Sequence, residues 1–221
     1  MELKNYLNVL LKRSWIILFV ALITASSAFA FSKLQTVVYR STIQLNVWPG
    51  RPDWGLQQTI KGLMRNYSGQ IKSRNTAQAV IDRQHLDLTV DDVLNKMTVS
   101  PIESDFLIQI DVDDIDPERA QIMAQTAAEV FVESIRVYML EQDKRDRVDV
   151  FIRDDATPAR VFWPKTSLLV AAGGLFGLFA GALVILSLEW LSADIIRSSR
   201  DVERHAGLPV LGSIPKMAKS Q

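Results

Sequence analysis

The chain has 221 residues, with 25 Lys+Arg balanced by 25 Asp+Glu, 48% hydrophobic residues, two histidines and no cysteine. The missing thiols exclude a disulfide scaffold, a thiolate zinc site, an Fe–S cluster and a cysteine nucleophile. The zero net charge offers no electrostatic basis for binding nucleic acid, and the composition is too apolar for a disordered chain.

The N-terminal part predicts a first membrane helix. Residues 1–13 form a short amphipathic segment ending in Lys12 and Arg13, and residues 14–31 follow without a charge. About 20 helical residues cross a hydrocarbon core of about 30 Å, so residues 14–31 are just long enough. A cleavable signal peptide is the alternative, because a basic start and an apolar run before Ala28-Phe29-Ala30 are typical of one.

Residues 32–166 have the pattern of a folded domain of mixed helices and strands. β-Branched residues at 37–47 predict a strand, and Thr89 fits the N-cap of a short helix. The further elements expected in this half are a helical stretch at 56–84, a short helix at 88–94, and strands at 97–102 and 106–112. Gly62 and Gly69 leave the continuity of the helical stretch open.

A long helix is expected to begin at Asp116-Pro117-Glu118 and to run to about Asp143. An aspartate cap, a proline in the first position and an acidic first turn all favour a helix start. Its apolar surface is expected to include Ile122, Thr126, Val130, Val137 and Met139. A last strand at 148–152 gives the order β-α-β-β-α-β, an α/β layer over a small sheet.

The aspartate-rich run at 111–116 partly imitates a calcium loop. Such a loop needs glycine at its sixth position and glutamate at its twelfth, where this chain has Asp116 and Ile122. We therefore interpret the run as a solvated strand end that leads into a helix cap.

Other polar residues do not form a catalytic constellation. The neighbouring carboxylates Asp91-Asp92 and Asp154-Asp155 are more typical of solvated loops and helix starts than of acid/base pairs, and His85 is expected at an exposed helix end. Neither a phosphate-binding loop nor a nucleophile elbow occurs in the sequence. We predict a protein that is not an enzyme, with no catalytic residue, cofactor or metal.

A second membrane helix is predicted at 167–188, where 22 residues carry no charge. The tail at 189–221 then contains three arginines soon after the apolar run. The positive-inside bias places both ends of the chain in the cytoplasm and residues 32–166 on the other side. The ends 1–13 and 189–221 together hold eight Lys+Arg against five Asp+Glu, and residues 32–166 hold 17 against 20, which agrees with this orientation.

Gly173, Gly177 and Gly181 form a double GxxxG pattern in the second apolar segment. Small residues four apart allow close approach of another helix, so we expect these glycines to form a packing face. The first apolar segment, with Ala21 and Ala25, and a neighbouring subunit are both candidate partners. The alternative is that glycine is simply common in membrane helices.

Several short motifs resemble one known family. Residues 6–16 (YLNVLLKRSWI) resemble its opening, residues 39–45 (YRSTIQL) its first strand, and residues 113–120 (DDIDPERA) its strand-to-helix junction. Pro158 and Pro164 resemble its proline-rich approach to the second span. The sharpest match is the DVE…GLPVLGSIP tail, which contains Asp201, Glu203, Gly207, Leu208, Pro209, Gly212 and Pro215. By these motifs the chain resembles the chain-length determinant family, the Wzz-like polysaccharide co-polymerases.

The resemblance implies a non-enzymatic homo-oligomer, a ring or partial ring in the inner or plasma membrane, with a periplasmic or extracellular central domain. Such a protein modulates the chain length or export of a capsule, exopolysaccharide or O-antigen. The implied partners are a polysaccharide polymerase, a cytoplasmic tyrosine kinase, or both, and the polysaccharide itself. The tail would be the cytoplasmic contact segment for a partner. The chain departs from the family pattern at Phe162-Trp163, where more prolines are common, and we expect a small two-span member without a fused kinase domain.

Two alternative functions remain open at this stage. The first is a membrane adaptor that activates a separate cytoplasmic tyrosine kinase. The second, from another class, is a membrane-anchored saccharide sensor or transporter accessory. The sequence shows no cluster of aromatic residues that would mark a sugar site, which argues against the second alternative.

Overall fold

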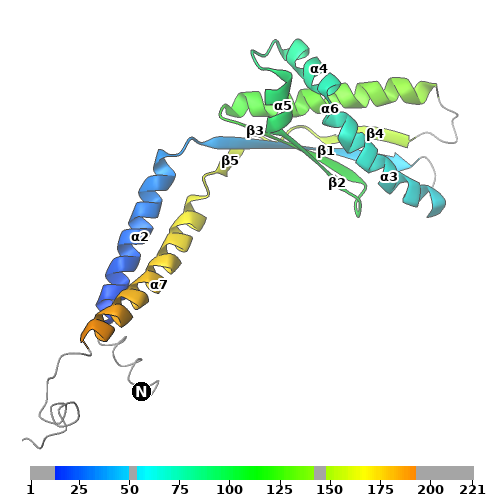
Figure 1. The fold of residues 1–221 in the computed structure, drawn as a ribbon. Helices are drawn as coiled ribbons and strands as arrows, with labels where there is room; N and C mark the ends of the chain where they lie inside the picture. The colour runs from blue at the N-terminus through cyan, green and yellow to red at the C-terminus, as the bar shows by residue number, and fades with distance from the viewer. Residues whose placement is uncertain (1–12, 50–53, 142–147, 193–221) are drawn as a thin grey trace, which may run out of the picture. The chain divides into compact units, whose positions relative to one another are not determined.

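A computed structural model describes residues 13–49, 54–141 and 148–192 (Figure 1). The chain divides into two compact units. One contains two long apolar helices, and the other extends over Leu34–Thr166.

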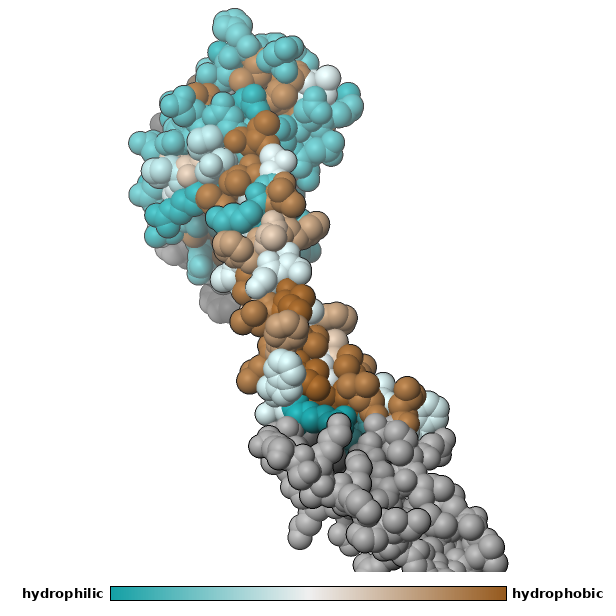
Figure 2. Space-filling view, turned by 90° about the vertical axis from the view of Figure 1, so that its left-hand side faces the viewer, coloured by the Kyte–Doolittle hydropathy of each residue, from teal (hydrophilic) through white to brown (hydrophobic). Residues whose placement is uncertain are grey.

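The helical unit consists of α2 (Ser14–Leu34) and α7 (Thr166–Ser192). Both helices extend beyond the apolar runs at 14–31 and 167–188, so each is long and apolar enough to cross a membrane. Their leucine and phenylalanine side chains are largely exposed, and Figure 2 shows this surface as mostly hydrophobic. A core helix of a soluble protein would instead bury most of its apolar residues.

The second unit is a mixed α+β domain. Its strands are β1 (Val38–Pro49), β2 (Met97–Ile102), β3 (Leu107–Asp114), β4 (Val148–Asp154) and β5 (Arg160–Trp163). Its helices are α3 (Trp54–Ile71), α4 (Arg74–Gln84), α5 (Val90–Lys96) and α6 (Pro117–Leu140). The four strands expected from the sequence are confirmed, whereas β5 was not foreseen.

The helical stretch expected at 56–84 is divided into α3 and α4. The division falls at Ser73, whose side chain accepts a hydrogen bond from the backbone N–H of Thr76 and so caps α4. Gly62 and Gly69 lie inside α3, where a Cβ would meet nothing within 4 Å. A serine cap, and not a glycine, therefore ends the continuity of this stretch.

The sheet is antiparallel in every pair, with strand order β2-β3-β1-β4. The short strand β5 pairs with the start of β1, at Val38↔Trp163 and Arg40↔Arg160. The central strand β1 places Ile43 opposite Ile110 and Leu45 opposite Ile152. These residues, of which Ile152 is only half-buried, lie on one face of the sheet, because side chains alternate between the two faces of a strand.

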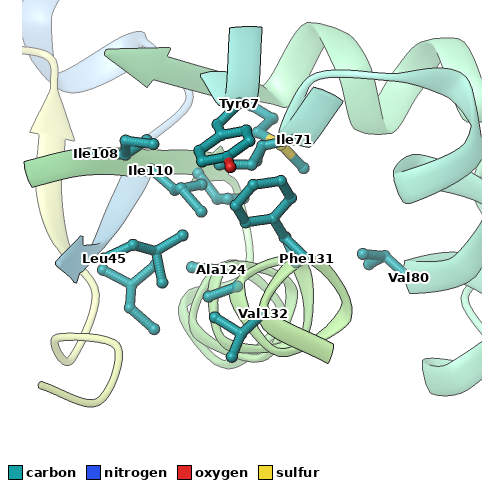
Figure 3. Packing of buried hydrophobic residues seen from close by; sticks show 14 of the residues in the cluster. Leu45, Tyr67, Ile71, Val80, Ile108, Ile110, Ala124, Phe131 and Val132 are labelled. Atoms are coloured by element: carbon teal, nitrogen blue, oxygen red, sulfur yellow. The ribbon is translucent and has the colours of Figure 1, made fainter. Parts of the chain in front are cut away.

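The core lies between this face and α6 (Figure 3). Phe131, Val132 and Ala124 of α6 lie close to Leu45 and the isoleucines of β3, and Tyr67 of α3 packs edge-on against Phe131 with ring centroids 5.6 Å apart. Aromatic pairs favour such edge-to-face geometry.

The apolar surface expected for α6 was partly wrong, although Met139 does pack against the core. Ile122 and Val137 are exposed, although Thr126 is buried as expected. The buried face consists mainly of smaller residues: Ala120, Met123, Ala124, Ala127 and Ala128, followed by Phe131, Val132 and Ile135. Alanines allow the helix backbone to approach the sheet closely, and the branched side chains that do face the core, Val132 and Ile135, lie in the C-terminal half of α6.

The start of α6 is confirmed, with Pro117 in the first turn and Asp116 as the N-cap. The carboxylate of Asp116 accepts hydrogen bonds from the backbone N–H groups of Glu118 and Arg119, at 3.0 and 3.4 Å. We expect Asp116→Ala to lower the free energy of unfolding by about 1 kcal/mol, because two helix-end donors lose their acceptor.

Denaturant unfolding of the full chain in detergent micelles, followed by circular dichroism, would measure this loss. Asp87→Ala is the matched control, since Asp87 is an exposed aspartate between α4 and α5. Equal unfolding midpoints for the two variants would contradict the capping role.

Candidate functional site

The three predicted packing glycines all face α2. A Cβ added to Gly173 would lie 2.8 Å from the Cβ of Ala28, and one added to Gly181 would lie 2.8 Å from the Cα of Ile17. The tightest position is Gly177, where a Cβ would lie 2.0 Å from Thr24 Oγ1 and 2.6 Å from Ala21 Cα. Only glycine fits such contacts, so within this chain α2 is the helix against which the GxxxG face packs.

Thr24 brings a polar group to this contact. Its hydroxyl donates to the backbone carbonyls of Val20 and Ala21, each at 3.0 Å. A hydroxyl satisfied within its own helix can lie in an apolar environment without a large desolvation penalty. At the far end of the pair, Arg13 lies 3.7 Å from Glu189, as two antiparallel helices allow.

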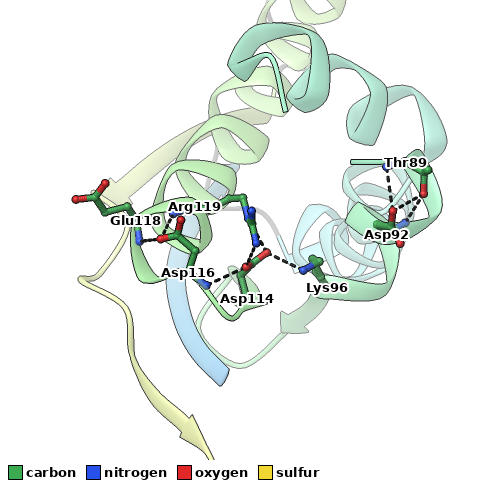
Figure 4. Close-up of polar contacts among 7 residues, drawn as sticks. All are labelled: Thr89, Asp92, Lys96, Asp114, Asp116, Glu118 and Arg119. Carbon is green, nitrogen blue, oxygen red and sulfur yellow. Dashed lines mark hydrogen bonds and ion pairs between the residues drawn. The ribbon is translucent and has the colours of Figure 1, made fainter. Parts of the chain in front are cut away.

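The aspartate run forms a network of ion pairs within the domain (Figure 4). The side chain of Asp114 is fully buried and accepts hydrogen bonds from Arg119, at 2.5 and 3.0 Å, and from Lys96 at 2.7 Å. The backbone N–H of Asp116 donates a further bond at 3.0 Å. The expected solvated strand end is therefore wrong, because cations of the chain itself engage this carboxylate.

The environment of Asp114 has two opposing effects on its pKa. Burial raises the pKa of the carboxyl by disfavouring the charged form, but the hydrogen bonds from Arg119, Lys96 and Asp116 outweigh burial and lower the pKa to about 2. The network joins the end of β3 to α5 and to the first turn of α6. It fixes the junction that the DDIDPERA motif marks in the sequence.

A second cluster fastens β5 to the sheet. Arg40 of β1 makes a bidentate pair with Asp113 of β3, with N–O distances of 2.5 and 2.6 Å. The guanidinium carbon of Arg40 lies 3.4 Å from the ring centroid of Phe162 in β5. A planar cation that pairs with a carboxylate and stacks on an aromatic ring links all three strands at once.

The proline-containing approach to α7 is connected to the same end of β1. The hydroxyl of Ser41 donates to the carbonyl of Thr157 at 2.7 Å, and the N–H of Thr157 donates to the carbonyl of Thr42 at 2.9 Å. Pro158 follows directly and is exposed, while Pro164 is half-buried after a cis peptide bond from Trp163. These bonds hold the segment between β4 and β5 on the sheet.

Replacing Arg40 with lysine should loosen β5. Lysine keeps the charge but loses both the bidentate geometry and the stacking on Phe162, so we expect a local loss of about 1–2 kcal/mol. Amide hydrogen exchange of the peptide containing Phe162 should become about tenfold faster or more. Arg153→Lys is the control, because Arg153 makes a hydrogen bond of 3.5 Å to Gln44 and an exposed ion pair of 3.8 Å with Asp154. A similar acceleration in the control would contradict the assignment.

Sequence reasoning did not foresee this second cluster. Arg40 and Asp113 lie within the motifs quoted above, but their pairing follows from the β1–β3 register and not from any local signal. The tail residues Asp201, Glu203, Gly207, Leu208, Pro209, Gly212 and Pro215 lie outside the described part of the chain. Within the described residues, no group of three or more potential metal-binding side chains occurs.

In the order of the sequence, one apolar helix precedes the antiparallel α+β domain and one follows it. Residues 1–87 match the Wzz family, described as "Chain length determinant protein". The chain is 27% identical over 217 residues to the capsular polysaccharide biosynthesis protein CpsC of Streptococcus pneumoniae, covering 94% of this chain and 91% of that protein.

Two further relatives are similar over nearly their whole length. CpsC of Streptococcus agalactiae is 25% identical over 221 residues, covering 97% of this chain and 94% of that protein. The probable capsular polysaccharide biosynthesis protein YwqC of Bacillus subtilis is 28% identical over 231 residues, covering 100% and 90%. These matches support the resemblance to the Wzz-like family that the motifs predicted.

Proposed function

We propose that this protein is a non-enzymatic, oligomeric polysaccharide co-polymerase that modulates the chain length or export of a capsular polysaccharide. The observation that carries the proposal is the similarity, over at least 90% of each chain, to relatives named for capsular polysaccharide biosynthesis. The match to the chain-length determinant family supports the same role.

In this proposal α2 and α7 are retained membrane spans, and the domain between them lies outside the cytoplasm. The length and apolar exposure of both helices support this arrangement. The glycine contacts favour a retained α2 over a cleaved signal peptide, because Ala21 and Thr24 fit the surface that Gly177 leaves open. The net charge of +3 on the predicted cytoplasmic ends and −3 on residues 32–166 agrees with the positive-inside bias.

In this proposal the chain catalyses no reaction and acts through its assembly and its contacts with partner proteins. Copies of the α+β domain would assemble side by side into a ring or partial ring, and the paired spans would contact a polysaccharide polymerase in the membrane. The stretch containing Pro158 and Pro164 would give a defined path from the sheet to α7, supported by its hydrogen bonds to β1. The segment from Asp201 to Pro215 would contact a cytoplasmic partner.

Deleting the gene in the source organism and complementing it would test the role. We expect a changed size distribution of the surface polysaccharide on gels, restored by the intact chain. An unchanged amount and size of the polymer would contradict the proposal. Light scattering of the detergent-solubilised protein would test the assembly, and a monomer at high concentration would contradict the ring.

A further inference from the structure

The fold brings two exposed aromatic residues together on the open face of the sheet. Trp48 on β1 is 59% exposed and Phe151 on β4 is 45% exposed. The register pairs Trp48 with Asp149 and Asn46 with Phe151, so these four side chains lie on the same face. Diagonal neighbours on adjacent strands are close enough for large rings to share one ligand.

These rings border a hollow of about 360 Å³ at the end of β4. Because α6 covers the opposite, buried face of the sheet, Arg136, Met139 and Leu140 of its last turns line the hollow from around the β4 edge. Asp149 of β4 supplies a carboxylate next to Trp48. On the open face the hollow therefore combines two aromatic rings with the carboxylate of Asp149.

Such a combination matches the chemistry of a sugar ring. Pyranose rings present C–H groups on their faces, which pack on aromatic rings, and hydroxyls at their edges, which bond to charged and amide side chains. The open face continues beyond Phe151 with Asn46 and with Gln44, whose amide donates to Gln109 at 3.3 Å. A row of amides beyond an aromatic platform suits a chain of several sugar units better than a single small molecule.

We infer that the open-face side of this hollow, defined by Trp48, Phe151 and Asp149, binds a saccharide segment of the polymer. The inference rests on the proposed function, because that function places a polysaccharide beside the domain. It also corrects the sequence-based argument against a sugar site. The aromatic cluster that the sequence lacks is formed by β1 and β4, which are paired in the sheet although they lie far apart in the chain.

The full chain in detergent micelles can be tested on an array of bacterial capsular and exopolysaccharide oligosaccharides. We expect binding to at least one of these glycans, and a decrease of about tenfold for Trp48→Ala and for Phe151→Ala, because each removes one stacking surface. Trp48→Tyr keeps an aromatic ring and should retain most of the binding. Val137→Ala is the matched control, since Val137 is also exposed on α6 but does not line the hollow.

The inference would be overturned if no glycan on the array is bound, or if both alanine variants bind as the wild type does. It would also be overturned if the two variants reduce self-association in light scattering and leave glycan binding intact, because the hollow would then be a contact between copies of the chain. Circular dichroism checks that the variants are folded, and Trp48→Tyr serves as the aromatic comparison if Trp48→Ala unfolds.

The cellular assay separates this inference from the proposed function. If gene deletion leaves the polymer unchanged, the co-polymerase role fails. If deletion changes polymer length but Trp48→Ala and Phe151→Ala complement fully, the role stands and the hollow is not the site.

Discussion

Replacing Gly177 with leucine is expected to abolish the close packing of α7 on α2. The first added carbon would lie 2.0 Å from Thr24 Oγ1 and 2.6 Å from Ala21 Cα, and backbone atoms cannot move aside without separating the helices. Overpacking of this kind typically costs about 1–3 kcal/mol, and a leucine against backbone should be at or above the upper end. Gly174→Leu is the matched control, because a Cβ at Gly174 meets nothing within 4 Å.

Disulfide cross-linking can measure the contact, since the chain contains no cysteine. In an Ala28→Cys, Gly173→Cys background the two Cβ positions are 2.8 Å apart, so a small outward shift reaches the roughly 3.5–4.5 Å of a disulfide. We expect an oxidised product with the gel mobility of a compact monomer. Adding Gly177→Leu should lower its yield about tenfold, whereas adding Gly174→Leu should not.

A different product would change the interpretation of the glycine face. Cross-linked dimers without the monomeric product would show that the face packs on α2 of a neighbouring subunit. Equal yields with Gly177→Leu and Gly174→Leu would contradict a packing role for Gly177.

Asp114→Asn is expected to be the most damaging single change in the α+β domain. It removes a fully buried charge and leaves Lys96 and Arg119, both only partly exposed, facing a neutral group. Removing one partner from a buried ion pair costs about 3 kcal/mol or more. Denaturant unfolding at neutral pH would measure the loss, with Asp91→Asn as the control, because Asp91 pairs with Arg74 on the surface and should contribute less than about 1 kcal/mol.

The same network predicts a loss of stability in acid. The pKa of Asp114 is lowered to about 2 in the folded chain, from an ordinary value near 4 in the unfolded chain. A lowered pKa means that the stabilisation is complete above pH 4 and disappears as the pH falls through the interval from about 4 to 2. The contribution of ionised Asp114 to the free energy of unfolding amounts to about 2 kcal/mol.

The loss of stability between about pH 4 and pH 2 should be absent in Asp114→Asn, because asparagine does not titrate. The difference in unfolding free energy between the wild type and Asp114→Asn should therefore become smaller in this pH range. A gap that stays constant from pH 6 to pH 2.5 would contradict an ionised Asp114.

Local signals in the sequence predicted the parts of the fold that depend on neighbouring residues. The caps at Thr89 and Asp116 are confirmed, and Thr89 forms a reciprocal capping box with Asp92. The exposed helix end at His85 is also confirmed, where a left-handed conformation ends α4. Such features depend on contacts between residues at most four positions apart, so they can be predicted from a single sequence.

Features that depend on distant pairing were missed. β5 is only four residues long and is defined by β1, so Arg160–Trp163 carries no strong strand pattern of its own. The burial of Asp114 depends on Lys96 in another element, and the sequence shows only an acidic run. The glycine pattern predicted a packing face but left its partner open, because a GxxxG face fits any helix with small residues opposite it.

The position of β5 has a mechanical consequence. The chain enters the sheet from α2 at Val38 and leaves it for α7 at Trp163, and these two residues are paired. Tension that separates the ends of the two spans would therefore pull on the end of the antiparallel β1–β5 pair. The hydrogen bonds of this pair would break one at a time. After Val38 and Tyr39 the opening would meet Arg40, held by Asp113 and stacked on Phe162, so the hydrophobic core would remain isolated from movements of the spans.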